Sequence, residues 1–135
     1  MIVVDASCLY EVLTRGPLAI QVQQALAQEE DYAAPELIDV EVTGLIRRDA
    51  HLGVLDATRC DIALSSLTDW PADRYSHQPF IWRVWELRDN VRTSDAFYVA
   101  LAEALDVPLL TLDARLSRAT GPRCEVIVPE TPSHV

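Results

Sequence analysis

The sequence predicts an α/β fold in which helices cover both faces of a parallel sheet, as a three-layer α/β/α sandwich. Short runs rich in Val, Ile and Leu alternate with longer segments of helical periodicity, which is the pattern of strands joined by helical crossovers. The runs at residues 2–4 and 109–112 lack polar alternation, as expected for strands that are buried on both faces. With 135 residues, half of them apolar, the chain is long enough for one domain with a hydrophobic core.

Helices and strands alternate along the chain. Apolar residues at helical spacing predict helices over residues 9–13, 18–28, 36 to about 50, 56–67, 79–87 and 94–105. Short apolar or β-branched runs predict strands over residues 2–4, 32–34, 107–112 and 125–128, and residues 69–78 have room for one more. No internal repeat interrupts this order, so one continuous sheet is expected.

Turn and cap residues set the boundaries of these helices. Gly16 and Pro17 end the first helix, because neither residue favours a helix interior. Pro35 is expected at the first position of the third helix, where its missing N–H is tolerated. Asp56 is expected to cap the fourth helix, and Ser94 is expected to cap the sixth.

One domain is expected over residues 1–128, followed by a flexible tail over residues 129–135 that contains two prolines. No apolar run approaches the roughly 18 residues needed to span a membrane, and no charged leader precedes a signal region. Cys8, Cys60 and Cys124 are odd in number and widely spaced, which is typical of reduced thiols. The sequence therefore predicts a cytoplasmic protein that makes no membrane contact.

The charge balance limits the kinds of site that the protein can have. The chain has 21 Asp and Glu against 11 basic residues, which gives a net charge of −10. No overall positive field attracts nucleic acid, so a nucleic-acid substrate needs local arginines or a bound cation. Every basic residue is an arginine, and the absence of lysine excludes phosphate-loop and Schiff-base chemistry.

Two acids directly follow predicted buried strands. Asp5 comes after the strand at residues 2–4, and Asp113 comes after the run at residues 109–112. The carboxyl ends of parallel strands share one edge of a sheet, so both carboxylates are expected at that edge. The alternative for each acid is a cap of the helix that follows, because Asp is favoured at that position.

Two more acids lie on apolar helix faces. Glu41 falls three residues after Ile38 and four before Leu45, which places it within the inward stripe of its helix. Asp95 precedes Tyr98 by three residues on a similar face. The alternative for Glu41 is an ion pair with an arginine, and the alternative for Asp95 is a cap or dipole interaction at its helix start.

Four acids at one edge predict a divalent metal site. Two carboxylates about 5 Å apart repel each other by roughly 3 kcal/mol at an effective dielectric of about 20, so the cluster needs a cation. Mg²⁺ or Mn²⁺ is expected, because both ions prefer oxygen ligands. No His or Cys is spaced to join the acids, which argues against Zn²⁺. Such a site suits metal-assisted hydrolysis of a phosphodiester.

Four segments resemble the motifs of a known nuclease family. They are MIVVDAS at residues 1–7, PELIDVE with LIRR at 35–48, RTSDAFYVALAE at 92–103, and LLTLD with a following leucine at 109–116. In order and spacing they resemble the PIN-domain ribonucleases, and more closely the VapC-type toxins of bacterial toxin–antitoxin modules. The resemblance covers nearly the whole chain.

This resemblance implies a five-stranded parallel sheet between helices and endonucleolytic cleavage of RNA that depends on Mg²⁺ or Mn²⁺. The four acids of the family fall on Asp5, Glu41, Asp95 and Asp113, which it implies are catalytic and hold the metal. Ser7 resembles a supporting residue of the family, and a cap of the next helix is an equal alternative for it.

Other positions near the acids also resemble the family. Asn90 resembles a recurrent polar position before the third acid, with a plain loop role as the alternative. Ser94 departs from the family, because many members have Tyr there, which concerns local contacts and leaves the acids intact. Arg92 and Arg115 each lie within three residues of a predicted ligand and are the favoured contacts for RNA phosphates. The expected substrate is single-stranded or looped RNA.

The family also implies protein partners. A small VapB-like antitoxin is expected to place a basic side chain near the acids, which is compatible with the net charge of −10. A homodimer is expected as well. Trp70, Trp82 and Trp85 could serve either interface, although Trp82 and Trp85 lie three apart on one helix and are expected to pack in the core.

Other families that begin with a strand and an Asp fit less well. A haloacid-dehalogenase phosphatase needs a second acid where Ser7 stands and also a lysine, and a receiver domain needs a lysine too. The remaining alternative is a catalytically idle PIN-like domain that acts only as a binding partner. The presence of all four acids argues against it.

Overall fold

The computed structural model describes residues 1–130 and contains a five-stranded parallel sheet. Neighbouring strands run in the order β3-β2-β1-β4-β5, and each pair is parallel. The strands are β1 (Ile2–Val4), β2 (Tyr32–Pro35), β3 (Asp73–Tyr75), β4 (Leu109–Leu110) and β5 (Val126–Ile127). All five correspond to predicted strands, including the short one within residues 69–78.

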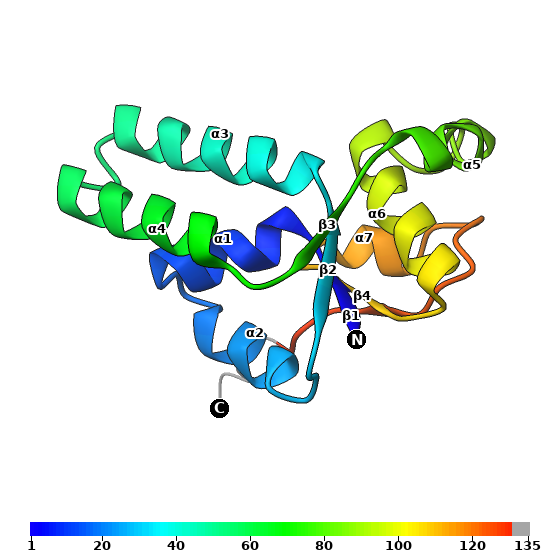
Figure 1. Ribbon diagram of the computed structural model, residues 1–135, viewed down its shortest axis with the longest axis horizontal. Coiled ribbons are helices and arrows are strands. Elements are labelled where there is room, and N and C mark those ends of the chain that lie inside the picture. Colours follow the sequence, from blue (N-terminus) through cyan, green and yellow to red (C-terminus); the bar gives the residue numbers. More distant parts are fainter. Residues whose placement is uncertain (131–135) are drawn as a thin grey trace.

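Helices cover both faces of this sheet. Figure 1 shows the sheet nearly edge-on, with α1 to α4 on one side and α5 to α7 on the other. Their bounds are α1 (Ala6–Thr14), α2 (Ala19–Leu26), α3 (Leu37–His51), α4 (Ala57–Asp69), α5 (Ile81–Glu86), α6 (Thr93–Leu105) and α7 (Ala114–Ser117), with the short 3₁₀ helix η1 (Gln78–Phe80) before α5. The predicted three-layer α/β/α architecture is therefore confirmed.

The strand β1 lies at the centre of the sheet, between two halves that the chain builds in opposite directions. From β1 the chain first adds β2 and β3 on one side, and then crosses over to add β4 and β5 on the other. Every side chain of β1 and β4 is buried. A crevice forms at the carboxyl ends of two strands where the order reverses in this way, so a ligand site is expected between β1 and β4.

The cap predictions have mixed outcomes. Asp56 caps α4 as predicted, since its carboxylate accepts the Arg59 N–H at 2.8 Å. Ser94 does not cap α6, because Arg92 holds the N-cap position and Ser94 already lies within the helix. The predicted helix at residues 79–87 begins as the 3₁₀ turn η1 and becomes α-helical only at Ile81.

The expected place of Pro35 at the start of a helix is wrong, because Pro35 ends β2 and pairs with Tyr75 of β3. The pairs between β1 and β2 stop at Ala33, so only β3 lies alongside β2 at Pro35. The next donor along the chain, the Glu36 N–H, makes the bond to the Tyr75 carbonyl at 2.9 Å. The missing N–H of Pro35 therefore leaves the sheet intact.

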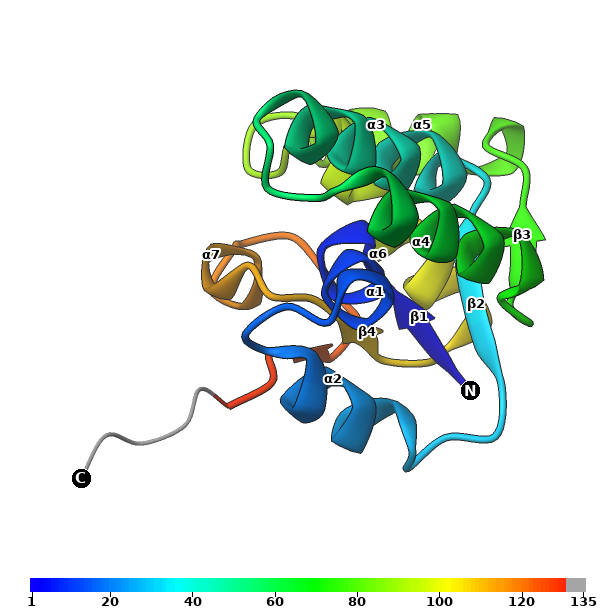
Figure 2. The same cartoon turned by 90° about the vertical axis from the view of Figure 1, so that its left-hand side faces the viewer.

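The predicted tail at residues 129–135 falls mostly outside the described residues, which end at 130, and a domain ending at residue 128 stays a prediction. Within the described part, Pro129 is buried and Glu130 is exposed. None of the helices in residues 1–130 is both long enough and apolar enough to cross a membrane. Figure 2, turned from Figure 1, shows the helices α1 to α4 in front of the sheet.

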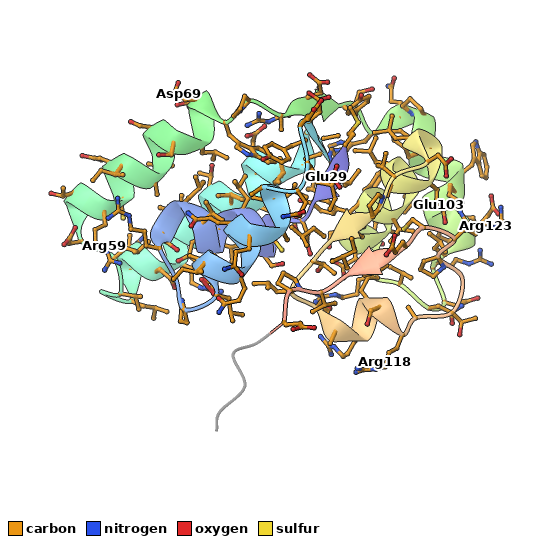
Figure 3. The ribbon with its side chains drawn as sticks, turned by 90° about the horizontal axis from the view of Figure 1, so that it is seen from below. Glu29, Arg59, Asp69, Glu103, Arg118 and Arg123 are labelled. Atoms are coloured by element: carbon orange, nitrogen blue, oxygen red, sulfur yellow. The ribbon has the colours of Figure 1, made fainter. Side chains whose placement is uncertain are left out.

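Arg74 of the edge strand β3 joins three elements. Its guanidinium makes two bonds to the Asp39 carboxylate of α3, at 3.2 and 3.0 Å. It also donates to three backbone carbonyls at the end of α4 and beyond, and it lies 5.0 Å from the centre of the Trp70 ring. Figure 3 shows α4 from below, with Arg59 and Asp69 near its two ends. Arg74 thus fastens the end of α4 and the edge of the sheet to α3.

Replacing Arg74 by Met should lower the free energy of unfolding by about 1–3 kcal/mol, because Asp39 and three part-buried carbonyls lose their partner. Urea denaturation followed by circular dichroism measures this loss. The matched control is Arg118→Met at an exposed position just after α7, which should change the free energy by less than about 0.5 kcal/mol. Equal effects of the two substitutions would contradict the role given to Arg74.

Candidate active site

One hollow at the carboxyl ends of β1 and β4 brings the four predicted acids together. It has a volume of about 320 Å³ and lies at the reversal point of the strand order. Each acid comes from a different element: the end of β1, the middle of α3, the first turn of α6 and the loop after β4. The residues of its wall that carry charge or a hydroxyl are Asp5, Ser7, Glu41, Arg92, Asp95 and Asp113.

Asp5 is the most buried of the four acids, with 8% of its surface exposed. Its N–H donates to the Leu110 carbonyl at 2.9 Å, which continues the pairing of β1 with β4. Its Oδ2 atom accepts the hydroxyl of Thr111 at 2.6 Å and the hydroxyl of Ser7 at 3.2 Å. Asp5 occupies the N-cap position of α1, but its side chain makes no capping bond, so the cap alternative does not explain it.

The same two hydroxyls position the loop after β4. The Ser7 hydroxyl accepts the Leu112 N–H at 3.2 Å, and the Thr111 hydroxyl accepts the Asp113 N–H at 3.1 Å. Each hydroxyl therefore accepts a bond from this loop while it donates to Asp5. Ser7 supports the first acid, and the alternative that it caps the next helix is not realised, because it lies within α1.

Glu41 is half-buried on the inward face of α3, and Tyr98 of α6 is its partner. The Tyr98 hydroxyl donates to Glu41 Oε1 at 2.7 Å, and Tyr98 itself is almost completely buried. The alternative of a buried ion pair with an arginine is therefore not what the structure shows. Tyr98 lies three residues after Asp95. The same face of α6 therefore supplies Asp95 and, through the Tyr98 hydroxyl, positions Glu41.

Asp95 and Asp113 are paired with exposed arginines. Arg92 Nε lies 3.4 Å from Asp95 Oδ2, and Arg115 Nε lies 3.4 Å from Asp113 Oδ1. About four fifths of each arginine side chain is exposed, at 77% and 80%, so water screens both pairs and they are weak. Asp113 also caps α7 by accepting the Arg115 N–H at 3.0 Å. It therefore acts as a helix cap, as the alternative prediction had it, and also lines the hollow.

A second, smaller hollow of about 240 Å³ adjoins the first and shares Asp95 and Asp113 with it. Asn90, Arg92 and Arg115 line this second hollow. These three residues, which the sequence suggested as supporting residues, therefore lie close to Asp95 and Asp113. Asn90 is exposed in the loop before α6.

Burial and mutual repulsion disfavour the charged form of the inner acids. Burial raises the pKa of Asp5 above its ordinary value, and the charge of Asp95 adds to this, against the bond from Thr111. Burial also raises the pKa of Glu41, opposed by the Tyr98 bond and reinforced by the charges of Asp5 and Asp95. The pKa of Tyr98 is raised by burial and by its bond to Glu41, so Tyr98 stays a hydrogen-bond donor.

The set of donors fits a hard divalent cation. Four carboxylates line the hollow, and those of Asp5 and Glu41 have raised pKa values, which a nearby cation would reverse. Within residues 1–130, however, no three His, Cys, Asp or Glu side chains stand close enough to share an ion as they are placed. The wall therefore supplies oxygen ligands of the kind that such an ion prefers, but the four carboxylates do not form a ready-made ion site.

The sequence matches a known family and named relatives. The family model of the PIN domain matches residues 2–122. Ribonuclease VapC1 of Mycobacterium tuberculosis is 41% identical over 125 residues, which cover 92% of this chain and 94% of that one. Ribonuclease VapC12 of the same species is 35% identical over 126 residues, covering 93% and 97%. The chain belongs to the PIN-domain family, among its VapC-type members.

Solved structures share the PIN-domain fold. FitAcB from Neisseria gonorrhoeae superposes with a TM-score of 0.72 at 14% identity, covering 96% of this chain and 98% of that one. VapBC2 from Rickettsia felis, bound to a DNA fragment from its promoter, superposes with a TM-score of 0.68 at 11% identity, covering 96% and 100%. These likenesses support the fold, and the sequence relatives support the family.

Sequence reasoning missed two residues that hold the acids of this PIN domain. Thr111 is the one polar residue in the apolar run 109–112, and this position inside a buried segment was the available signal. Tyr98 lies on the same helix face as Asp95, and its hydroxyl needed a buried partner. Both signals show that a partner exists, and only the folded structure shows which acid it is.

Replacing Thr111 by Val should lower the free energy of unfolding of this PIN domain by about 1–3 kcal/mol, because a buried carboxylate loses its donor and the Asp113 N–H its acceptor. Chemical denaturation measures the loss. Thr111→Ser keeps the hydroxyl and is the matched control, which should retain most of the stability. A Val variant as stable as wild type would show that the hydroxyl is dispensable.

Glu41→Gln should stabilise the PIN domain at neutral pH in EDTA, because Gln can still accept the Tyr98 bond and carries no charge. Below the ordinary pKa of Glu, the side chain is protonated in both the folded and unfolded states and contributes no difference. As the pH rises, the unfolded chain releases this proton first, so the wild type loses stability relative to the variant. Denaturation curves in acid and at neutral pH check this trend. A difference that does not change with pH would contradict it.

Proposed function

We propose that this protein is an endoribonuclease that hydrolyses RNA phosphodiester bonds with the help of Mg²⁺ or Mn²⁺. The observation that carries the proposal is the hollow in which carboxylates from four separate elements meet. The names of the two mycobacterial relatives, both ribonucleases, support RNA as the substrate. A single-stranded or looped region is the expected target, because its phosphates and bases are accessible.

The four acids, Asp5, Glu41, Asp95 and Asp113, would hold the metal. When bound, the ion would supply activation of the attacking water and stabilisation of the charge that develops on the phosphate. Thr111, Ser7 and Tyr98 keep two of these carboxylates oriented toward the hollow. The weak pairing of the exposed Arg92 and Arg115 leaves their guanidinium groups available to phosphates of the substrate.

We further propose that the protein is the toxin of a type II toxin–antitoxin module and is inhibited by a cognate VapB-like antitoxin. The acidic hollow and the net charge of −10 suit a partner with a basic side chain. The VapBC2 structure, which shares this fold, supports such a companion. Co-purification with the product of the neighbouring gene tests this, and the absence of any small companion would indicate a stand-alone nuclease.

A homodimer in the cytoplasm is the assembly that we propose. Sedimentation of the purified chain over a range of concentrations tests the dimer, and a monomer at all concentrations would contradict it. Fractionation of cells that express the protein tests its location. Neither result bears on the cleavage chemistry, which the four acids carry.

Asp95→Asn should leave the fold intact and lower the rate of RNA cleavage at least about a hundredfold, because one metal ligand is weakened. Gel assays of RNA cleavage with added Mg²⁺ or Mn²⁺ measure the rate, and EDTA should abolish it. The control is Asp61→Asn on the exposed face of α4, which should cleave as wild type does.

The wild type and these two variants, together with Asp5→Asn, distinguish a nuclease from a catalytically idle binding domain. In a nuclease, Mg²⁺ or Mn²⁺ raises the thermal midpoint of the wild type, and Asp5→Asn reduces this gain. An idle domain would cleave no RNA, so the wild type, Asp95→Asn and Asp61→Asn would give the same result in the cleavage assay. Full activity of Asp95→Asn would contradict the assignment of Asp95 to the active site.

A further inference from the structure

The helix α5 turns its large apolar side chains toward solvent. Trp82 is 79% exposed, Trp85 is 59% exposed and Ile81 is 51% exposed, although the sequence led us to expect both tryptophans in the core. The opposite side of the helix supplies Val84 and Leu87, which are buried in the core. Large aromatic residues left in water on one short helix indicate a binding surface rather than a packing defect.

These tryptophans form part of an open groove of about 510 Å³ between α5 and the start of α6. Of its lining residues, Trp82 and Trp85 belong to α5, and Thr93 and Phe97 belong to α6. Arg88 also lines it, and this residue contributes the only charge among the residues of the wall. The wall is therefore aromatic, with one cation at its margin.

Arg88 lies over this aromatic surface. Its guanidinium carbon lies 4.6 Å from the centre of the Trp85 ring, and its Nη1 donates to the Trp85 carbonyl at 2.9 Å. A stacked guanidinium keeps further donors free to bind a phosphate or a base edge. Aromatic rings with a stacked arginine are the surface that unpaired nucleobases use in single-stranded RNA complexes.

The groove and the hollow that contains Asp95 are lined by neighbouring residues of the chain. Arg88 and Thr93 line the groove, while Asn90 and Arg92, which lie between them in sequence, line the hollow that contains Asp95. Six residues reach no more than about 20 Å even when fully extended, and this segment turns. A strand whose phosphate lies at the acids therefore has bases within reach of the two tryptophans.

We propose that the exposed face of α5 is a stacking platform for unpaired bases of the RNA, a few nucleotides from the phosphate that is cut. This inference rests on the proposed nuclease function and adds the surface that holds the substrate. The chain has a net charge of −10, so a polyanion can approach only where arginines line its path. Arg88 and Arg92 supply that charge between the platform and the acids.

A second copy of the chain is the rival occupant of this face. A second copy would offer Arg88 no phosphates to bind. RNA offers flat bases that stack on the tryptophan rings and phosphates that bind the arginines. The exposed tryptophan rings and the nearby arginines thus favour RNA.

The test uses the full chain with Asp95→Asn, so that RNA binds without being cut. A short single-stranded RNA of mixed sequence should bind and quench tryptophan fluorescence, and the same RNA in a perfect duplex should bind more weakly. Trp82→Ala and Trp85→Ala should each weaken single-strand binding about tenfold. Leu52→Ala, which removes an exposed apolar residue from the turn between α3 and α4, is the matched control and should bind unchanged.

Cleavage by the same tryptophan variants without Asp95→Asn separates this inference from the proposed function. A raised KM with kcat within about twofold of wild type supports a platform for the substrate. If wild type cleaves the RNA and both tryptophan variants bind and cleave it equally well, the platform is overturned while the nuclease stands. A change in sedimentation with no change in KM overturns it in favour of a second copy. If wild type cleaves no RNA, the nuclease proposal itself fails.

Discussion

The hydrogen bonds between β1 and β4 fix the first acid, and the other three acids are arranged around it. The Asp5 N–H continues the pairing of the two strands, and the Asp5 carboxylate accepts the hydroxyl of Thr111 from the end of β4. Because β1 is central and fully buried, this junction cannot shift without disturbing the whole sheet. The helices α3 and α6 then bring Glu41 and Asp95 to the same place from opposite sides of the sheet.

The cluster of acids opposes folding, and the rest of the domain has to offset it. Burial and repulsion act against ionisation of Asp5 and Glu41, while the hydroxyls of Thr111, Ser7 and Tyr98 act in favour of it. The stabilising contacts lie elsewhere, in the apolar core and in hydrogen bonds such as those from Arg74 on the edge strand to Asp39. Catalytic sites typically combine charged groups that lower the stability of the fold with a well-packed core around them that offsets this loss.

The sequence was sufficient to predict the layers, the five strands and the meeting of the four acids, because strand ends and helix faces are visible in periodicity. Glu41 was the clearest case, since a charge interrupted an apolar stripe. The bond from Thr111 to Asp5 was not predictable, because a hydroxyl in a buried run shows that a partner is needed but does not show which one it is. Trp82 and Trp85 were placed wrongly because a helix of six residues is too short for its periodicity to show which side faces inward. Pro35 was placed wrongly because its local preference was overridden by the sheet.

The central place of β1 has a consequence for how the protein is made. The strand β1 pairs with β4, which is synthesised more than one hundred residues later, as the bond between Asp5 and Thr111 shows. Contacts of such long sequence separation form late and slowly in folding. A nascent chain that has not reached residue 113 lacks the last acid and its supporting strand. The set of carboxylates is therefore completed only after residue 113 has been synthesised.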